Sequence, residues 1–153
     1  MKIILHPDPR LRQRSIPLEL AVLKSDKTQK LIADLKITMK EAKGIGLAAP
    51  QVGQNIRIII VNTEIGPTAF INPRIIWHSL RKELDEEGCL SIPGIYGLVK
   101  RHRSVVMNYW DEAGNKQRIR VKGLFARVLQ HEIDHLNGIL FIDKMVKQVA
   151  GGY

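Results

Sequence analysis

The chain has 153 residues, of which 44% are hydrophobic and 25% charged, so we expect one soluble globular domain spanning residues 1–153. A single cysteine excludes an internal disulfide, and no apolar run is long enough for a membrane span or a signal peptide, so a cytoplasmic protein without membrane contact is expected. The net charge of +9 favours attraction to RNA-rich particles, but the basic residues are spread along the chain, so we expect no recognition of a specific nucleic-acid sequence.

The N-terminal third predicts a surface arm and a helix. Residues 6–12 contain two prolines and predict an extended arm or turn. From residues 25–28 to residue 43, apolar side chains keep helical spacing, with Gly44 as the stop signal. Residues 44–53 are small or apolar apart from Gln51, so their backbone can approach another element or a ligand closely. Tight packing alone would also explain that composition.

The middle of the chain predicts strands and one turn-rich loop. Residues 57–61 are typical of a buried strand, and residues 83–87 form an acidic approach to a loop at residues 88–94, which carries Cys89. Residues 104–121 alternate around a polar turn, which indicates a hairpin. Further strands are expected at residues 69–72, halted by Pro73, at 75–77 and at 98–99. The predicted class is α+β, with mainly antiparallel strands wrapped around one central helix.

That central helix begins near Leu124, ends at Asn137-Gly138 and contains an H-E-x-x-H motif. Residues four apart lie one above the other in a helix, so His131 and His135 can face one metal ion. Glu132 is offset by about 100° and can reach a water on that metal. Apolar residues cover most of the helix circumference, so we expect the helix to be buried, with one narrow polar strip. The strip consists of Arg127, Gln130 and Asp134.

A third metal ligand is needed, because H-E-x-x-H also occurs by chance in proteins that bind no metal. Cys89 is a candidate, since it lies in a loop flanked by glycine and proline. A thiolate, two imidazoles and a water would form an open tetrahedral site, which is typical of a catalytic metal. The alternative for a lone cysteine is a small buried side chain with no ligand role.

Three segments together resemble the signature motifs of the peptide deformylase family, in the family's order and spacing. They are Gly-Ile-Gly-Leu-Ala-Ala-Pro-Gln at residues 44–51, Glu-Gly-Cys-Leu-Ser at 87–91 and Gln-His-Glu-Ile-Asp-His-Leu at 130–136. The resemblance extends from residues 7–11 to residues 140–143, nearly the whole chain.

The resemblance implies a role for each matching residue. It implies that Cys89, His131 and His135 hold the metal, that Glu132 is the general acid/base, and that the Gln51 amide and the Leu90 N–H stabilise the oxyanion. It further implies that Gly46 hydrogen-bonds the substrate backbone and that Ile45, Leu124 and Val128 line a methionine pocket. Arg101 matches a basic residue that in relatives lies near the C-terminal side of the substrate.

The implied function is metal-dependent removal of the formyl group from the N-terminal formyl-methionine of nascent polypeptides, with release of formate. One divalent ion is implied, Fe²⁺ first, with Zn²⁺, Ni²⁺ or Co²⁺ as substitutes. Relatives with a long C-terminal helix use it to dock on the ribosome, whereas the stretch after Asp143 is short here, so only a transient ribosome contact is expected. An organellar copy whose targeting segment has been removed stays an alternative to a cytoplasmic one.

Two other function classes share parts of this pattern. A zincin-type metallopeptidase has the same H-E-x-x-H motif, but it would not explain the cysteine loop or the segment ending at Gln51. A non-catalytic, zinc-stabilised RNA-binding module would require a fourth protein ligand. The remaining histidines, His6, His78 and His102, lack a motif context for that role.

Overall fold

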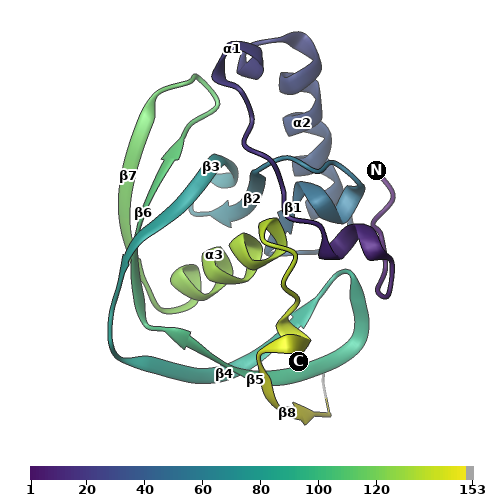
Figure 1. The fold of residues 1–153 in the computed structure, drawn as a ribbon, viewed down its shortest axis with the longest axis vertical. Helices are drawn as coiled ribbons and strands as arrows, with labels where there is room; N and C mark the ends of the chain where they lie inside the picture. The colour runs from purple at the N-terminus through teal and green to yellow at the C-terminus, as the bar shows by residue number, and fades with distance from the viewer. Residues whose placement is uncertain (151–153) are drawn as a thin grey trace.

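The computed structural model describes residues 1–150 as two antiparallel sheets around a central helix (Figure 1). The larger sheet has five strands in the order β1-β2-β3-β6-β7, and the smaller has three in the order β4-β5-β8. The strands are β1 (Gly46–Ala48), β2 (Ile58–Thr63), β3 (Gly66–His78), β4 (Lys82–Cys89), β5 (Ile92–His102), β6 (Ser104–Trp110), β7 (Lys116–Lys122) and β8 (Met145–Val149). The helices are α1 (Leu20–Leu23), α2 (Asp26–Glu41) and α3 (Gly123–Leu136), with short 3-10 turns at Pro9–Arg12, Ala49–Val52 and Phe141–Asp143.

Strand β2, which lies between β1 and β3, explains why the large sheet is covered on both faces. Its side chains alternate, so Ile58 and Ile60 pack into a cluster with α2 on one face of the sheet. Ile59 and Val61 pack into a second cluster with α3 on the other face. The α+β class with antiparallel strands around a central helix is therefore confirmed.

Helix α3 is buried more completely than its apolar pattern alone requires. Every residue from Ala126 to Leu136 is buried, and this includes the polar strip of Arg127, Gln130 and Asp134. The helix ends as predicted, with Gly138 in the left-handed region at φ 72°. Its first turn departs from the prediction, because the Leu124 side chain is 66% exposed.

The acidic segment before Cys89 is a strand and not part of a loop. Residues 82–89 form β4, which turns at residues 90–91 into β5, so the predicted loop at 88–94 is much shorter. An edge strand tolerates a polar sequence, and β4 pairs with β5 alone. Across this pair Glu83 lies opposite Arg101, so side chains of opposite charge stabilise the pairing. The β4 sequence does not alternate between apolar and polar residues, and its periodicity therefore did not predict a strand.

Pro73 does not end its strand, contrary to the prediction. β3 continues to His78 because its pairing with β6 is irregular between Ile71 and Arg74, where a missing backbone donor costs little. Asn72, just before the proline, has φ 49°.

The N-terminal arm is more tightly held than a surface arm would be. Its 3-10 turn buries Leu11, and its backbone bonds to two segments that carry predicted site residues. Ile4 N–H donates to the Gln51 carbonyl at 2.7 Å and His6 N–H donates to the Ser91 carbonyl at 2.8 Å.

Helix α2 begins as expected and ends at Glu41, slightly earlier than its glycine suggested. Ser25 caps its N-terminus by accepting from the Thr28 N–H at 3.3 Å. The left-handed residue after the helix is Lys43, at φ 54°, and not Gly44. None of the helices within residues 1–150 is long and apolar enough to cross a membrane.

Candidate functional site

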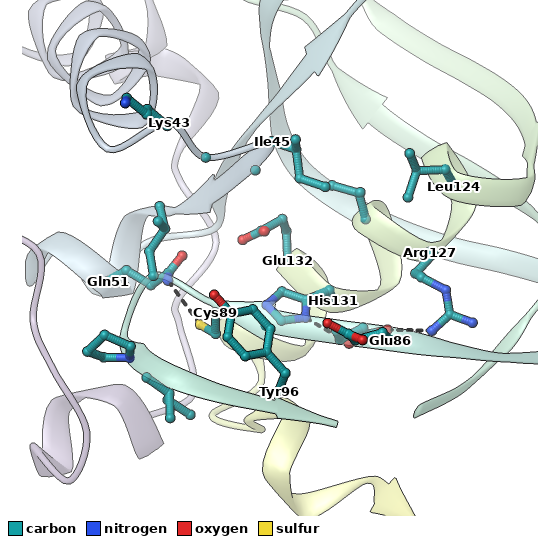
Figure 2. A pocket seen from close by; sticks show the side chains of 18 of the residues that line it. Lys43, Ile45, Gln51, Glu86, Cys89, Tyr96, Leu124, Arg127, His131 and Glu132 are labelled. Carbon is teal, nitrogen blue, oxygen red and sulfur yellow. Dashed lines mark hydrogen bonds and ion pairs between the residues drawn. The ribbon is translucent and has the colours of Figure 1, made fainter. Parts of the chain in front are cut away.

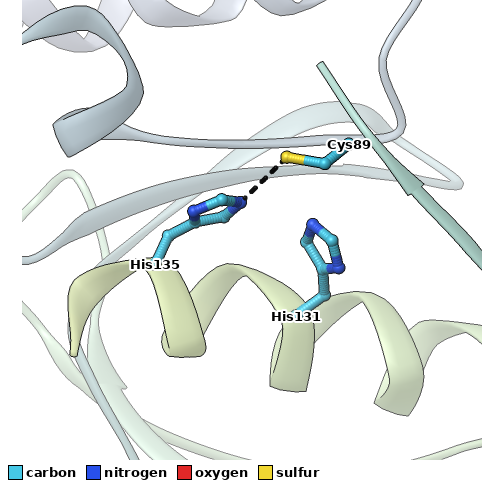
Figure 3. A group of neighbouring side chains, drawn as sticks. All are labelled: Cys89, His131 and His135. Carbon is cyan, nitrogen blue, oxygen red and sulfur yellow. Dashed lines mark hydrogen bonds between the residues drawn. The ribbon is translucent and has the colours of Figure 1, made fainter. Parts of the chain in front are cut away.

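Cys89 and the two motif histidines lie together between β4 and α3 (Figure 3). Their ligand atoms all lie within 4.8 Å of one another, and Cys89 Sγ is 3.3 Å from His135 Nε2. Donors at this spacing can surround an ion at the ~2.0–2.3 Å bond lengths usual for nitrogen and sulfur ligands. Within residues 1–150 no other group of three such side chains comes together.

A buried carboxylate orients the first histidine ligand. Glu87 Oε2 lies 2.9 Å from His131 Nδ1, which leaves His131 Nε2 for the metal cluster. The Arg101 guanidinium donates to both Glu87 oxygens, at 2.8 and 2.9 Å, and Arg127 donates to Oε1 at 2.8 Å. Burial opposes the charge on Glu87, but the hydrogen bonds from Arg101 and His131 outweigh it and hold the pKa of Glu87 below its usual range.

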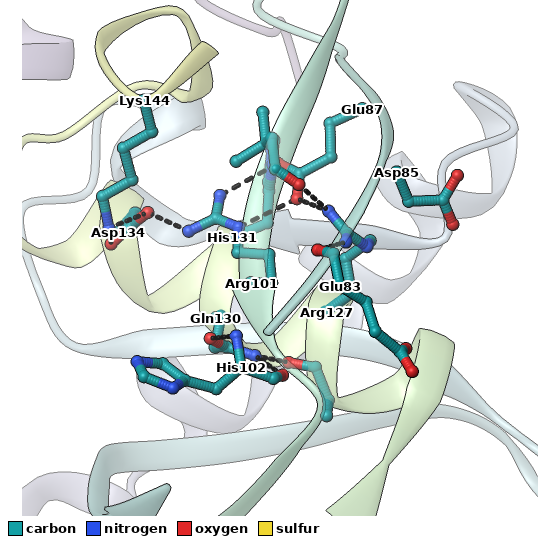
Figure 4. A network of polar contacts seen from close by, with 12 residues as sticks. Glu83, Asp85, Glu87, Arg101, His102, Arg127, Gln130, His131, Asp134 and Lys144 are labelled. Atoms are coloured by element: carbon teal, nitrogen blue, oxygen red, sulfur yellow. Dashed lines mark hydrogen bonds and ion pairs between the residues drawn. The ribbon is translucent and has the colours of Figure 1, made fainter. Parts of the chain in front are cut away.

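The same network ties α3 to β4, to β5 and to Lys144, the residue that precedes β8 (Figure 4). Arg101 on β5 also pairs with Asp134 on α3, and Lys144 Nζ donates to Asp134 at 2.8 Å. Sequence reasoning missed Glu87 as a functional residue. The available signal was the charged strip on a buried helix, which requires opposite charges from a neighbouring element.

The predicted substrate contact of Arg101 is not supported by its position. Its side chain is 4% exposed and is not part of the wall of the cavity that carries Cys89 and His131. The guanidinium is already used by two carboxylates, so it serves the buried network.

A cavity of about 470 Å³ opens in front of the cluster (Figure 2). Cys89, His131 and Glu132 form part of its wall. The other predicted residues on that wall are Ile45, Gly46, Gln51, Leu90, Leu124 and Val128. Tyr96 on β5 also lines the cavity, and its aromatic ring had no motif that could single it out beforehand.

The amide of Gln51 has a fixed orientation. Gln51 Oε1 accepts from the Ala48 N–H at 2.8 Å, and only an oxygen can accept there. Gln51 Nε2 therefore points to the cluster, where it lies 3.5 Å from Cys89 Sγ and 3.1 Å from Ser91 Oγ. A donor aimed this way can meet negative charge that develops beside the metal position.

Glu132 combines deep burial with a free oxygen. It is 4% exposed, and its Oε2 has no hydrogen-bond partner among the described residues. Burial raises the pKa of Glu132 to about 7, so the carboxyl group can both take up and release a proton near neutral pH. Gly46 makes room for it, because a Cβ at that position would lie 2.4 Å from Glu132 Oε1.

His135 is prepared for metal binding by burial. It is 1% exposed, and burial lowers the pKa of His135 well below its usual range. The imidazole is therefore neutral at pH 7, which is the form that donates a lone pair to a metal.

Comparisons with known proteins agree on one family. A sequence profile of the polypeptide deformylase family matches residues 1–150. A peptide deformylase from Brucella suis is 45% identical over 150 residues, which covers 95% of this chain and 84% of the relative. The crystal structure of a peptide deformylase from Synechococcus elongatus in complex with actinonin superposes with a TM-score of 0.89 at 42% identity, covering 95% of this chain and 78% of that one. The Thermotoga maritima enzyme gives 0.89 at 38% identity, covering 94% of this chain and 96% of that one.

Proposed function

The chain belongs to the peptide deformylase family, a family of metal-dependent hydrolases that act on nascent formylated peptides, and we propose how its own residues perform that reaction. The observation that carries the proposal is the Cys89, His131 and His135 cluster in contact with a cavity that also holds the free carboxylate of Glu132. The reaction is hydrolysis of the formyl amide on an N-terminal methionine, which yields formate and a free amine. One catalytic domain spanning residues 1–153 performs it.

The donor set fits one divalent ion, held by Cys89 Sγ and by the imidazoles of His131 and His135. When bound, the ion lowers the pKa of a water ligand and polarises the formyl carbonyl. Glu87 fixes the His131 ring through the 2.9 Å contact at Nδ1, so the ligand is presented in one orientation. Fe²⁺ is the proposed physiological ion, with Zn²⁺, Ni²⁺ or Co²⁺ as substitutes.

Glu132 is the proposed proton carrier. Its unpartnered Oε2 accepts a proton from the attacking water and delivers it to the departing amine nitrogen. Gln51 Nε2 and the Leu90 backbone N–H donate to the carbonyl oxygen as its negative charge grows, and one such donor is worth roughly 10²–10³ in rate. Both residues line the cavity.

The substrate backbone and side chain have separate sites in this proposal. Gly46 belongs to β1, an edge strand of the five-stranded sheet, so an extended peptide can pair with its outer backbone groups. Ile45, Leu124 and Val128 form an apolar wall for the methionine side chain. The exposure of Ile45 at 55% and Leu124 at 66% suits residues that a ligand covers.

The cellular setting is proposed from the same reaction. A deformylase of nascent chains works where translation occurs, so we place this one in the cytoplasm with transient contact to the ribosome. The stretch after Asp143 was expected to lack a docking helix, and it forms β8 over Met145–Val149. Residues 151–153 lie outside the part of the chain that the structure describes.

The test compares formyl-Met-Ala, acetyl-Met-Ala and an unmodified peptide as substrates for anaerobically purified protein of measured metal content. We expect release of formate from the first alone, with one metal ion per chain. Cleavage of a peptide bond in the unmodified peptide would instead support a zincin-type peptidase, and metal without turnover would contradict the assigned residues.

A further inference from the structure

A second cavity, of about 700 Å³, borders a different side of α3 from the one that carries the metal ligands. Its α3 residues include Gln130 and Asp134, whereas those of the first cavity include Val128, His131 and Glu132. We call it the basic groove and define it by Arg14, Ser15, Arg57, Arg74, Asp134 and Lys144. These residues come from the arm, the approach to β2, β3, α3 and the C-terminal segment.

The positive charge of the basic groove is not balanced within the described chain. Arg14, Arg57 and Arg74 form no ion pair with any residue of 1–150. The one carboxylate on its wall, Asp134, is already paired with Arg101 and with Lys144 (Figure 4). An anion that enters the groove therefore meets three guanidinium groups that no carboxylate of the described residues neutralises.

Arg57 is held in a setting that favours an added anion. Its Nη1 donates only to neutral oxygens, the Leu136 carbonyl at 3.2 Å and Asn137 Oδ1 at 3.1 Å. Burial lowers the pKa of Arg57, and the positive charge of Arg14 lowers it further. A negative group between the two guanidinium groups would relieve that repulsion.

The buried hydroxyl of Ser15, on the wall of the same groove, lacks a hydrogen-bond partner among the described residues. Ser15 is 4% exposed. Leaving a buried hydroxyl unsatisfied costs about 1–3 kcal/mol.

We propose that the basic groove binds phosphate groups of an RNA backbone, with Arg14, Arg57 and Arg74 as the contacting cations. Guanidinium groups match phosphate oxygens in pairs, and cations that come from several elements suit a repeating phosphodiester better than one small anion. The overall charge of +9 adds long-range attraction of the same sign. Because the groove and the catalytic cavity are separate, the protein holds RNA and a peptide substrate at once.

The test measures binding of a short fluorescein-labelled RNA hairpin by anisotropy over a series of salt concentrations. The groove variant is Arg14→Ser with Arg74→Ser, two exposed side chains. Its matched control is Lys27→Ser with Lys30→Ser, two exposed lysines on α2, which packs on the opposite face of the sheet. Both variants remove two positive charges, so a difference in RNA affinity between them reflects where the charges lie and not the net charge.

We expect the groove variant to lose about tenfold or more in affinity and to lower the slope of log K against log salt by about 2, whereas the control changes by less than about twofold. Equal losses in both variants, or none, would overturn the proposal. Displacement of the labelled RNA by polyglutamate as effectively as by unlabelled RNA would also overturn it. So would a protein that binds no RNA but whose Tm inorganic phosphate raises at matched ionic strength, if the groove variant loses that rise. Turnover of formyl-Met-Ala should be unchanged in both variants, which separates this result from any failure of the proposed reaction.

Discussion

At the scale of single residues, the site depends on pairs in which one residue fixes the orientation or the space of a neighbouring side chain. Glu87 fixes His131, the Ala48 N–H fixes the Gln51 amide, and Gly46 makes room for Glu132. The sequence predicted the cysteine, the two histidines and Glu132, because their spacing is local or their loop is distinctive. It did not predict Glu87 as their support, since that contact joins positions 44 residues apart.

We predict that Glu132→Gln keeps its metal and lowers kcat by about 10²–10⁴-fold, because the role proposed for the residue is proton transfer and not metal binding. Metal analysis and formyl-Met-Ala kinetics on the same preparation check this. The amide has nearly the same shape as the carboxyl group, so the fold is preserved. Loss of metal, or turnover near that of the unaltered protein, would remove Glu132 from its assigned role.

Gln51→Ala should lower kcat by roughly 10²–10³-fold with a smaller effect on KM, because an oxyanion donor acts mainly in the transition state. Gln54→Ala is the matched control, since it removes the same amide from an exposed side chain three positions away. Steady-state kinetics with formyl-Met-Ala decide the outcome. A change confined to KM would assign Gln51 to ground-state binding.

Gly46→Ala should reduce kcat by displacing the Glu132 carboxylate, since the added Cβ would lie 2.4 Å from Oε1. Overpacking of this kind also costs about 1–3 kcal/mol of stability. The Glu132→Gln background provides the control. If both changes act through the carboxylate, Gly46→Ala lowers kcat little further in that background, whereas additive losses would show an independent effect on substrate binding.

At the scale of elements, the sequence predicted the helices and strands whose own residues determine their structure. Helices α2 and α3, strand β2 and the β6–β7 hairpin follow from apolar spacing and turn residues. Strands β4 and β8 were missed, because both lie at edges of the small sheet, where β4 is polar and β8 is only five residues long. Their strand structure comes from pairing with β5 and not from their own pattern.

The contact between the N-terminal arm and the segment after α3 can be tested through pH. Arg12 pairs with Asp143, and Asp143 Oδ2 accepts from the Leu140 N–H at 2.9 Å. The Arg12 guanidinium holds the pKa of Asp143 below its usual range. A carboxyl group with a depressed pKa stabilises the fold at pH values above its unfolded pKa, and this contribution is lost as pH falls through the folded pKa.

Asp143→Asn should therefore lower the free energy of unfolding at pH 7 by roughly 0.5–1 kcal/mol, because the pair is partly exposed and screened by solvent. The difference from the unaltered protein should shrink as the pH falls below about 4, the ordinary pKa of an aspartate in an unfolded chain. Urea unfolding at several pH values measures it. Glu64→Gln, an exposed carboxyl group that forms no ion pair within residues 1–150, is the control. A difference that is the same at every pH would contradict the linkage.

At the scale of the whole molecule, the metal cluster joins parts that already have their own cores. The three apolar clusters centre on α2, on α3 and on the small sheet with the arm, and Cys89 packs at the border of the third. Metal removal should therefore lower Tm without unfolding the protein, because the ion adds stability only by binding the native state. We therefore expect the identity of that ion to change activity more than folding.

The last prediction concerns this ion. A thiolate with two imidazoles binds iron, zinc, cobalt and nickel alike, so affinity alone does not select one. A ferrous centre beside a thiolate is open to oxidation by air, and an oxidised Cys89 no longer donates as a ligand. We expect apo-protein reconstituted with Fe²⁺ under nitrogen to deformylate faster than the Zn²⁺ form and to lose activity in air, while the Ni²⁺ form is air-stable. Formyl-Met-Ala turnover before and after exposure to air, with Tm as a measure of folding, separates chemical inactivation from unfolding. Equal and air-stable turnover with iron and zinc would contradict the assignment of iron and leave the reaction itself unaffected.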